Sequence, residues 1–405
     1  METLRCQNER ILYYFLIGCL YLFFAKGIIE PHIKWFGLMD EVFVLLAPAV
    51  LLFKRKIKRT ILIPLVLGYV LSGIFGTILF GYQPWNAVLA DFIACVKIWL
   101  AIYIGYEMYS YFDLEFYAPY IYRHLKIIIG TIGIAFILDA FFDLWPVGER
   151  YGIKVFFLFG TNGSVMNSEY VMLLMMLFLI IPYVKKTAIW FMTLYIALFM
   201  SLRTKAMGIV LVALFLSYTI HYRGRKISVK RLVLPVFAII CCAIPSIIFY
   251  YFGPNVSQSP RAQLTNVSFL IARDLFPIGT GLATFGSFYS GKYYSPIYAL
   301  YGIDNVYGMT KENTMYLSDT CWPILFGQFG WLGTIFFVAA LLVLWGKIQK
   351  QFLINKGKYM AAMLFFLATL VNSTSEPAFF NSVIVANAFL CGIAISTDRT
   401  TPQLL

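Results

Sequence analysis

Apolar runs close in length to a membrane-crossing helix constrain this chain more than any other feature. A helix needs about 20 mostly apolar residues to cross the hydrocarbon of a bilayer, and runs near that length recur from residue 11 to residue 395. Charged residues make up 13% of the chain, whereas soluble domains carry about 25%. Open sheets cannot cross lipid, and the strands of a barrel would alternate rather than run solidly apolar. The sequence therefore predicts an all-α polytopic membrane protein.

About twelve transmembrane helices are expected, forming a single membrane domain over residues 1–405. The predicted spans are 11–29, 35–53, 60–80, 86–108, 127–145, 165–184, 187–202, 205–222, 232–252, 320–345, 359–375 and 378–395. The first run lacks the small-residue cleavage site of a signal peptide, so we expect it to remain as a membrane helix.

Basic residues indicate which ends of these helices face the cytoplasm. Lysines and arginines follow the second, fourth, sixth, eighth and tenth spans, in segments 54–59, 123–126, 185–186, 223–231 and 347–358. These segments all fall on one side of the membrane, which is the cytoplasmic side by the positive-inside rule. Both termini are then cytoplasmic, and the long loop 253–319, between helices 9 and 10, is extracytoplasmic.

The net charge of +13 does not indicate nucleic-acid binding. A nucleic-acid site gathers basic residues on one folded surface, whereas here they lie in short connectors between apolar runs. The seven cysteines lie mostly within apolar runs and form no C-x-x-C pair. Neither a disulfide framework nor a zinc site is predicted.

Loop 253–319 is the only connector long enough to form a site of its own. It contains Arg261 and Arg273, a glycine-rich run at 279–286, and the carboxylates Asp304, Glu312 and Asp319. We interpret it as the part of the molecule that handles substrate, with the apolar helices as its scaffold.

One predicted outer connector breaks the charge rule. Arg203 and Lys205 lie between spans seven and eight, on the side where basic residues are rare. One interpretation is an anion site, because the guanidinium fork matches phosphate oxygens. The other is a pair of long side chains that reach up to the lipid headgroups. Lys205 would add charge as a point donor, so Arg203 is the more specific of the two.

Three segments together resemble the O-antigen polymerase and ligase superfamily. The first is Ser-Leu-Arg-Thr-Lys-Ala-Met-Gly at 201–208. The second, Asp-Leu-Phe-Pro-Ile-Gly-Thr-Gly-Leu-Ala-Thr-Phe at 274–285, is close to the superfamily's Pro-x-x-Gly-x-Gly-x-x-x-Phe segment. The third, 318–333, is similar to the loop-to-helix junction of polysaccharide repeat-unit polymerases. The resemblance covers about half of the chain, from span seven to span ten.

This resemblance implies a membrane-embedded glycosyltransferase of the GT-C type, acting on the outer face of a bacterial cytoplasmic membrane. The donor would be a glycan on undecaprenyl diphosphate and the acceptor a second lipid-linked repeat unit. Members of this kind need no metal or other cofactor, and a chain-length regulator protein is a further implied partner. The product would be a capsular or O-antigen polysaccharide.

The implied chemistry assigns roles to individual residues. A sugar hydroxyl attacks the anomeric carbon, and fixed cations stabilise the charge on the departing diphosphate. Arg203 is the first candidate, and Arg261 and Arg273 support it from the loop. The expected substrate-binding residues are Lys205, Gly279, Gly281, Asp304 and Glu312. Gly279 and Gly281 would form a tight turn or let the backbone approach substrate closely.

The general base is open at this stage. The ligase branch carries a histidine near the end of its long loop, but His32, His124 and His221 all lie elsewhere. Asp319 stands close to the expected position. It either accepts the proton of the acceptor hydroxyl or caps the helix that follows. Asp304 and Glu312 are further candidates for the base.

Several side chains in the loop and the spans have two interpretations. Arg273 and Asp274 also fit a simple exposed ion pair. The loop tyrosines are expected either to stack on sugar rings or to pack the loop onto the membrane: Tyr289, Tyr293, Tyr294, Tyr298, Tyr301 and Tyr307. Glu376 sits at an outward end, within reach of the same external cavity.

Two rival functions remain. A ligase would transfer finished glycan to lipid A core or another acceptor, although the missing histidine weakens this alternative. A flippase or exporter of lipid-linked oligosaccharide would use a polar pathway through the membrane. The charged residues predicted within spans, which are expected to face the bundle interior, favour it: Asp91, Lys97, Asp139 and Glu169. Such proteins usually show related halves, and none is visible here.

Overall fold

The computed structural model describes residues 2–30, 33, 40–41, 60–109, 112–145, 148–161, 163–228, 230–231, 248 and 259–396. Two predicted spans, 35–53 and 232–252, lie essentially outside these residues, as does the basic segment 54–59. Most of the described chain is helical, as the apolar runs predict.

The long helices follow the apolar runs in order. They are α1 (Glu2–Ile29), α3 (Leu62–Phe80), α4 (Trp85–Tyr109), α5 (Leu114–Phe142), α6 (Gly163–Ile180), α7 (Ala188–Phe199), α8 (Thr204–Leu216), α14 (Gly330–Ile354), α15 (Lys356–Asn372) and α16 (Val385–Ile395). Short 3-10 segments η3 (Ile181–Tyr183), η7 (Ala378–Phe380) and η8 (Ser382–Ile384) adjoin α6 and α16. The π-helical turns η4 (Ser217–Tyr222) and η6 (Leu325–Phe329) extend α8 and join α13 (Trp322–Ile324) to α14.

Six helices in the described part of the chain are long and apolar enough to cross a membrane. They cover Leu62–Phe80, Trp85–Tyr109, Leu114–Phe142, Gly163–Tyr183, Thr204–Tyr222 and Trp322–Ile354. The apolar segments Ala188–Phe199 and Ser382–Ile395 are shorter. These six helices support a membrane protein; the total of twelve spans and their orientation remain predictions.

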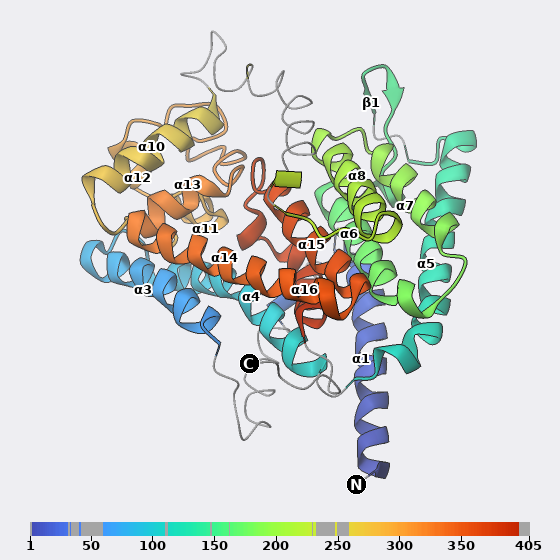
Figure 1. The fold of residues 1–405 in the computed structure, drawn as a ribbon. Helices are drawn as coiled ribbons and strands as arrows, with labels where there is room; N and C mark the ends of the chain where they lie inside the picture. The colour runs from blue at the N-terminus through green and yellow to red at the C-terminus, as the bar shows by residue number, and fades with distance from the viewer. Residues whose placement is uncertain are drawn as a thin grey trace.

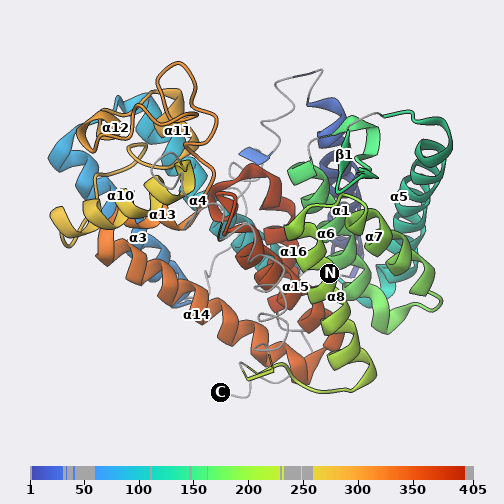
Figure 2. The same ribbon diagram turned by 90° about the horizontal axis from the view of Figure 1, so that it is seen from above.

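The helices form two groups joined by a central one (Figures 1 and 2). α1 and α5–α8 stand together on one side, while α3 and α14 pack against each other on the other side. α4, α15 and α16 lie between these groups, with α4 packed on α16 and α15 packed on both α6 and α8. The described part of the long loop, with α10 (Pro260–Asp274), lies beside α3 and α14 (Figure 1).

Two of the expected basic connectors prove to be partly helical. α5 begins at Leu114, where the Asp113 side chain accepts the Phe116 N–H at 3.1 Å as an N-cap. Segment 123–126 therefore lies inside α5. Lys347 and Lys350 likewise lie inside α14, which ends at Ile354. The predicted spans were shorter because hydropathy marks the apolar length of a helix, whereas lysine and arginine are good helix formers that continue it into water.

A short hairpin interrupts the helical pattern. β1 (Glu149–Arg150) pairs antiparallel with β2 (Ile153–Lys154) between α5 and α6. The all-α prediction did not include it. The two-residue turn has Tyr151 and Gly152 at φ +55° and +72°, the backbone geometry that such hairpin turns require.

The charged residues predicted within spans are buried, as expected. Asp91 on α4 accepts the Ala283 N–H at 2.8 Å, which ties the long loop to the bundle. Lys97 instead pairs with Asp40 at 2.9 Å. Asp91 and Lys97 are thus each satisfied by a different partner and do not pair with each other.

Residues 259–321, which we call the outer unit, fold around a small core of their own. Its helices are α10 (Pro260–Asp274), α11 (Phe288–Lys292) and α12 (Ile297–Leu300). Leu264, Ile271, Phe285 and Tyr298 are fully buried within this core.

The tyrosines of the outer unit divide between its core and its surface. Tyr298 hydroxyl accepts the Gly286 N–H at 3.0 Å and packs the unit from within. Tyr307 is exposed.

The glycine run packs the outer unit onto the membrane helices. Gly281 has φ +98°, and a Cβ there would lie 2.4 Å from the Thr77 nitrogen on α3. A Cβ on Gly279 would lie 2.3 Å from the Gly327 carbonyl oxygen. Both glycines are buried. The close backbone approach of Gly279 and Gly281 is therefore to the protein's own helices, and substrate binding by these glycines stays a prediction.

Candidate functional site

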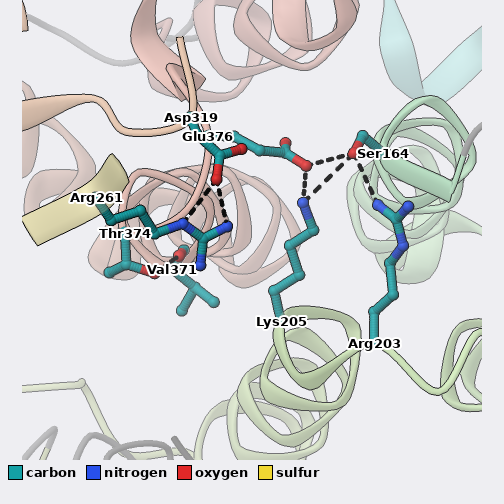
Figure 3. Close-up of polar contacts among 8 residues, drawn as sticks. All are labelled: Ser164, Arg203, Lys205, Arg261, Asp319, Val371, Thr374 and Glu376. Atoms are coloured by element: carbon teal, nitrogen blue, oxygen red, sulfur yellow. Dashed lines mark hydrogen bonds and ion pairs between the residues drawn. The ribbon is translucent and has the colours of Figure 1, made fainter. Parts of the chain in front are cut away.

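Arg203 lies at the N-terminal end of α8, where the chain turns sharply out of α7. Leu202 takes a left-handed φ of +47°, and Arg203 follows as the extended N-cap residue of α8. Its Nη1 donates to Ser164 Oγ at 2.8 Å, and its Cζ lies 5.4 Å from the centre of the Phe157 ring. The connector that breaks the charge rule thus points its guanidinium inward, toward the start of α6 (Figure 3).

Arg203 has no carboxylate partner within the described part of the chain. Its Nε is buried without a hydrogen-bond partner. Burial, and then the positive charge of Arg150 on β1, lower the pKa of Arg203 below its ordinary value. A guanidinium remains protonated even so. The result is a cation that lacks a counterion and part of its hydration, which is a favourable place for an anion to bind.

Gly163 provides the space that the Arg203 side chain occupies. A Cβ at Gly163 would lie 2.6 Å from Arg203 Nε and 2.7 Å from the Phe157 ring. Gly163 is also the first residue of α6, so the positive end of that helix faces the same space. α8 likewise begins here, and its first turn has no side-chain cap.

Lys205, one residue into α8, extends the cationic surface toward the centre of the molecule. Its Nζ forms an ion pair with Glu376 Oε1 and lies 3.4 Å from Ser164 Oγ. Ser164 in turn donates its hydroxyl hydrogen to the same Glu376 oxygen. Glu376 stands between α15 and η7, and its side chain is 15% exposed. α6, α8 and the α15–η7 connector therefore meet at one point (Figure 3).

Arg261 and Asp319 form a second pair beside the first group. Arg261 follows Pro260 in the first turn of α10. Its Nε and Nη2 approach Asp319 Oδ2 at 2.7 Å and 2.6 Å. The expected capping role of Asp319 is wrong, because the N-cap of α13 is Cys321 and has no side-chain hydrogen bond. Burial raises the pKa of Asp319 and outweighs the opposing effects of Arg261 and Lys205.

Lys205 connects the two groups electrostatically. It interacts electrostatically with Arg203, Asp319, Arg261 and Arg150. Figure 3 shows its side chain between those of Arg203 and Arg261. We call the set Arg150, Ser164, Arg203, Lys205, Arg261, Asp319 and Glu376 the cation cluster. Among its described residues, four basic side chains stand against two carboxylates, so basic groups outnumber acidic ones.

The structure does not bring the remaining predicted site residues to this cluster. Arg273 pairs with the adjacent Asp274 at 2.8 Å, and its side chain is 72% exposed. Arg273 lies twelve residues beyond Arg261 on α10, about 18 Å along the helix axis at about 1.5 Å per residue. Asp304 and Glu312 are exposed on the outer unit, where both raise the pKa of Tyr294 after its burial. Arg273 thus forms the exposed ion pair that was its alternative interpretation, and its supporting role stays a prediction.

Sequence reasoning missed four residues of the site: Arg150, Phe157, Gly163 and Ser164. A Gly-Ser pair before an apolar run is an ordinary helix start, so no sequence signal connects it with Arg203. Glu376 was recognised as an outward carboxylate, but its contact with Lys205 and Ser164 depends on how α15 packs against α6 and α8.

A comparison of the chain with known protein families matches no family, and a comparison with curated proteins finds no match. The site is therefore assigned from its own chemistry. Among the described residues, an excess of basic side chains, an arginine without a carboxylate partner and two helix N-termini come together beside two carboxylates. The first three features are typical of sites that bind anions.

Proposed function

We propose that this protein is a polymerase that joins undecaprenyl-diphosphate-linked oligosaccharide repeat units into a surface polysaccharide, a capsule or an O-antigen. It would act on the outer face of a bacterial cytoplasmic membrane. Arg203 is the observation that carries the proposal, because it is a half-buried guanidinium without a carboxylate partner among the described residues. A diphosphate would provide the counterion that Arg203 lacks.

The charge balance of the cluster supports a diphosphate. Its excess of basic over acidic side chains suits an anion better than a neutral sugar. Six membrane-length helices suit a donor whose lipid tail stays in the bilayer while its headgroup reaches the cluster. The outer unit stands over the same end of the molecule (Figure 1) and would contact the glycan.

The proposed reaction needs no group beyond the protein's own side chains. The acceptor hydroxyl attacks the anomeric carbon of the donor, and the bond from that carbon to the diphosphate oxygen breaks. Arg203 and Lys205 stabilise the negative charge that develops on the leaving oxygen. Preorganised cations of this kind act most strongly in a site with little water, and the burial of Arg203 Nε provides such surroundings.

The direct test is product analysis with purified protein in lipid vesicles. Wild-type protein supplied with lipid-linked repeat units should produce a ladder of lipid-linked chains on a gel. A single transfer to a non-repeat acceptor would instead favour a ligase. Movement of labelled oligosaccharide across sealed vesicles without a new glycosidic bond would favour a flippase and overturn the proposal.

A further inference from the structure

We propose that Glu376 is the general base of this glycosyl transfer and that its ion pair with Lys205 weakens it as a base until the donor binds. This inference rests on the proposed function, and it fills the role that the sequence left unassigned. It starts from the contacts that Glu376 makes with one hydroxyl and one ammonium group.

The Ser164 hydroxyl occupies the position that an attacking hydroxyl needs. Its oxygen accepts a hydrogen bond from Arg203 Nη1 at 2.8 Å, and its hydrogen points to Glu376 Oε1. An acceptor sugar must likewise place its oxygen near the cation that holds the leaving group and its hydrogen toward a base within hydrogen-bond reach. Ser164 therefore marks, within the protein itself, where a hydroxyl fits between Arg203 and Glu376.

Asp319 is the competing candidate, and its geometry is less suitable. Burial raises the pKa of Asp319, which favours a base. Both contacts from Arg261, however, converge on its Oδ2, and no hydroxyl group of the described residues has a hydrogen bond to it. Since a base must first lie within reach of the proton it removes, Glu376 fits better, and Asp319 serves to position Arg261.

Lys205 connects the base to donor binding. In the structure its Nζ pairs with Glu376 Oε1, so the carboxylate is partly neutralised. Lys205 and Arg203 leave the same end of α8, and a diphosphate bound by Arg203 would compete with Glu376 for the Lys205 ammonium. Transfer of Lys205 to the phosphate would release Glu376 at the moment when the donor is in place.

The step balances with the groups present. The acceptor hydroxyl gives its proton to Glu376, and its oxygen forms the new bond to the anomeric carbon. The electron pair of the broken bond stays on the diphosphate, which Arg203 and Lys205 hold. The products are a lengthened lipid-linked glycan and free polyprenyl diphosphate; the Glu376 proton then passes to water.

The test replaces the sugar acceptor with azide, a nucleophile that carries no proton to remove. Glu376→Ala should reduce polymer formation at least a hundredfold, as expected for loss of a general base, yet still form glycosyl azide from the lipid-linked donor. Arg203→Ala should form neither product, because the leaving group loses its cation. If Glu376→Ala forms polymer within a few-fold of wild type, or if azide fails to restore transfer, the assignment of Glu376 is overturned.

Three further variants separate a base from a merely structural counterion. If Glu376 only neutralises Lys205, the double variant Glu376→Gln/Lys205→Met should be as active as Lys205→Met alone, because no ammonium then needs a counterion. A base predicts that the double variant forms polymer at least a hundredfold more slowly than Lys205→Met. It also predicts that Glu376→Gln binds polyprenyl diphosphate at least as tightly as wild type, because Lys205 is released from its ion pair. Equal polymer formation by Lys205→Met and the double variant would contradict the base.

One measurement needs only wild-type protein and therefore does not depend on a variant folding. As pH falls, polymer formation should decline while azide transfer stays constant over the range where azide is anionic. A parallel decline of both reactions would exclude a carboxylate base. Absence of any glycosidic product from wild-type protein would instead reject the proposed function itself.

Discussion

Arg203 and Arg261 are both arginines at the start of a helix in the same cluster, yet their surroundings differ. Arg261 has its charge balanced by Asp319, whereas Arg203 has only a serine hydroxyl and an aromatic ring as described contacts. An arginine already paired with a carboxylate must give up that ion pair to bind a substrate anion, so the net gain in electrostatic stabilisation is small. An arginine without a carboxylate partner gives up no ion pair when the substrate anion binds, so it gains the whole of the new electrostatic interaction. The difference supports our proposal that Arg203 binds the leaving group, whereas Arg261 is held in place by its own counterion.

The largest effect is expected at Arg203 itself. Arg203→Ala should lower the polymerisation rate by about 10²–10³, by analogy with the loss of one oxyanion-stabilising donor. Arg203→Lys should retain part of the rate, because it keeps the charge but loses the planar fork. Rates of chain growth in vesicles measure both variants.

A suitable control for this comparison is Arg225→Ala. Arg225 is exposed just beyond η4, at the opposite end of the α8 segment from Arg203. We expect it to leave the rate unchanged. Equal losses in both variants would show that net charge, rather than the position of Arg203, matters.

The second prediction concerns Gly163→Ala, a variant that should displace the Arg203 side chain without removing it. A Cβ in Gly163→Ala would lie 2.6 Å from Arg203 Nε, so the guanidinium must shift. A displacement of about 1 Å can cost about 10²-fold in rate, and we expect a loss of about ten- to a hundredfold. Thermal stability should not rise, because the same Cβ would lie 2.7 Å from the buried Phe157 ring, and this clash opposes the helical preference of alanine over glycine, about 0.5–1 kcal/mol.

Gly346→Ala is the matched control for the glycine variant. Gly346 lies inside α14, and a Cβ there would meet nothing within 4 Å. Gly346→Ala should keep full activity and gain the helical stability that alanine has over glycine, about 0.5–1 kcal/mol. A Gly163→Ala enzyme as active as Gly346→Ala would show that the position of Arg203 is not critical.

The third prediction concerns the balanced arginine. Arg261→Ala and Asp319→Ala should each destabilise the protein, because each leaves a partly buried charge without its partner. The double variant should recover part of the loss, with a coupling of about 0.5–3 kcal/mol. Denaturation midpoints in detergent of the wild type, the two single variants and the double variant measure this coupling. If the losses of the two single variants simply add up in the double variant, the ion pair contributes nothing to stability.

The smallest effect is a pH dependence of stability that arises from Asp319. Burial raises the pKa of this carboxyl in the folded protein, so the folded state binds its proton more tightly than the unfolded state. The stability that Asp319 contributes is therefore present at acidic pH and is lost as pH rises through its raised pKa. The difference in Tm between wild type and Asp319→Asn should fall over that range; a difference that rises with pH would contradict the raised pKa.

The sequence predicted the membrane-length helices well where hydropathy changes abruptly. The predicted span 60–80 corresponds to α3, and 86–108 to α4, within two residues at each end. It failed at α5, whose N-terminal half carries Arg123, His124 and Lys126. Charge marks the limit of an apolar run, but the helix continues because its backbone hydrogen bonds persist in water.

The candidate site was predicted only in part. Arg203 and Lys205 were recognisable because basic residues in a predicted outer connector need an explanation. Arg261 and Arg273 looked equivalent in the sequence, and only the straight course of α10 separates them. Gly279 and Gly281 looked like residues of a substrate loop until their contacts with Thr77 and Gly327 showed that they pack the outer unit onto the bundle.

The sequence by itself determined the apolar helices and the unusual position of Arg203, since hydropathy and charge are properties of short stretches of chain. The tertiary structure decided which groups meet. Arg203 contacts a residue 39 positions away, Arg261 one 58 away, and Ser164 one 212 away. Such distant pairings depend on how whole helices pack. The counterions of the cluster, and the lack of one at Arg203 among the described residues, therefore emerge only when α6, α8, α10 and the α15–η7 connector come together.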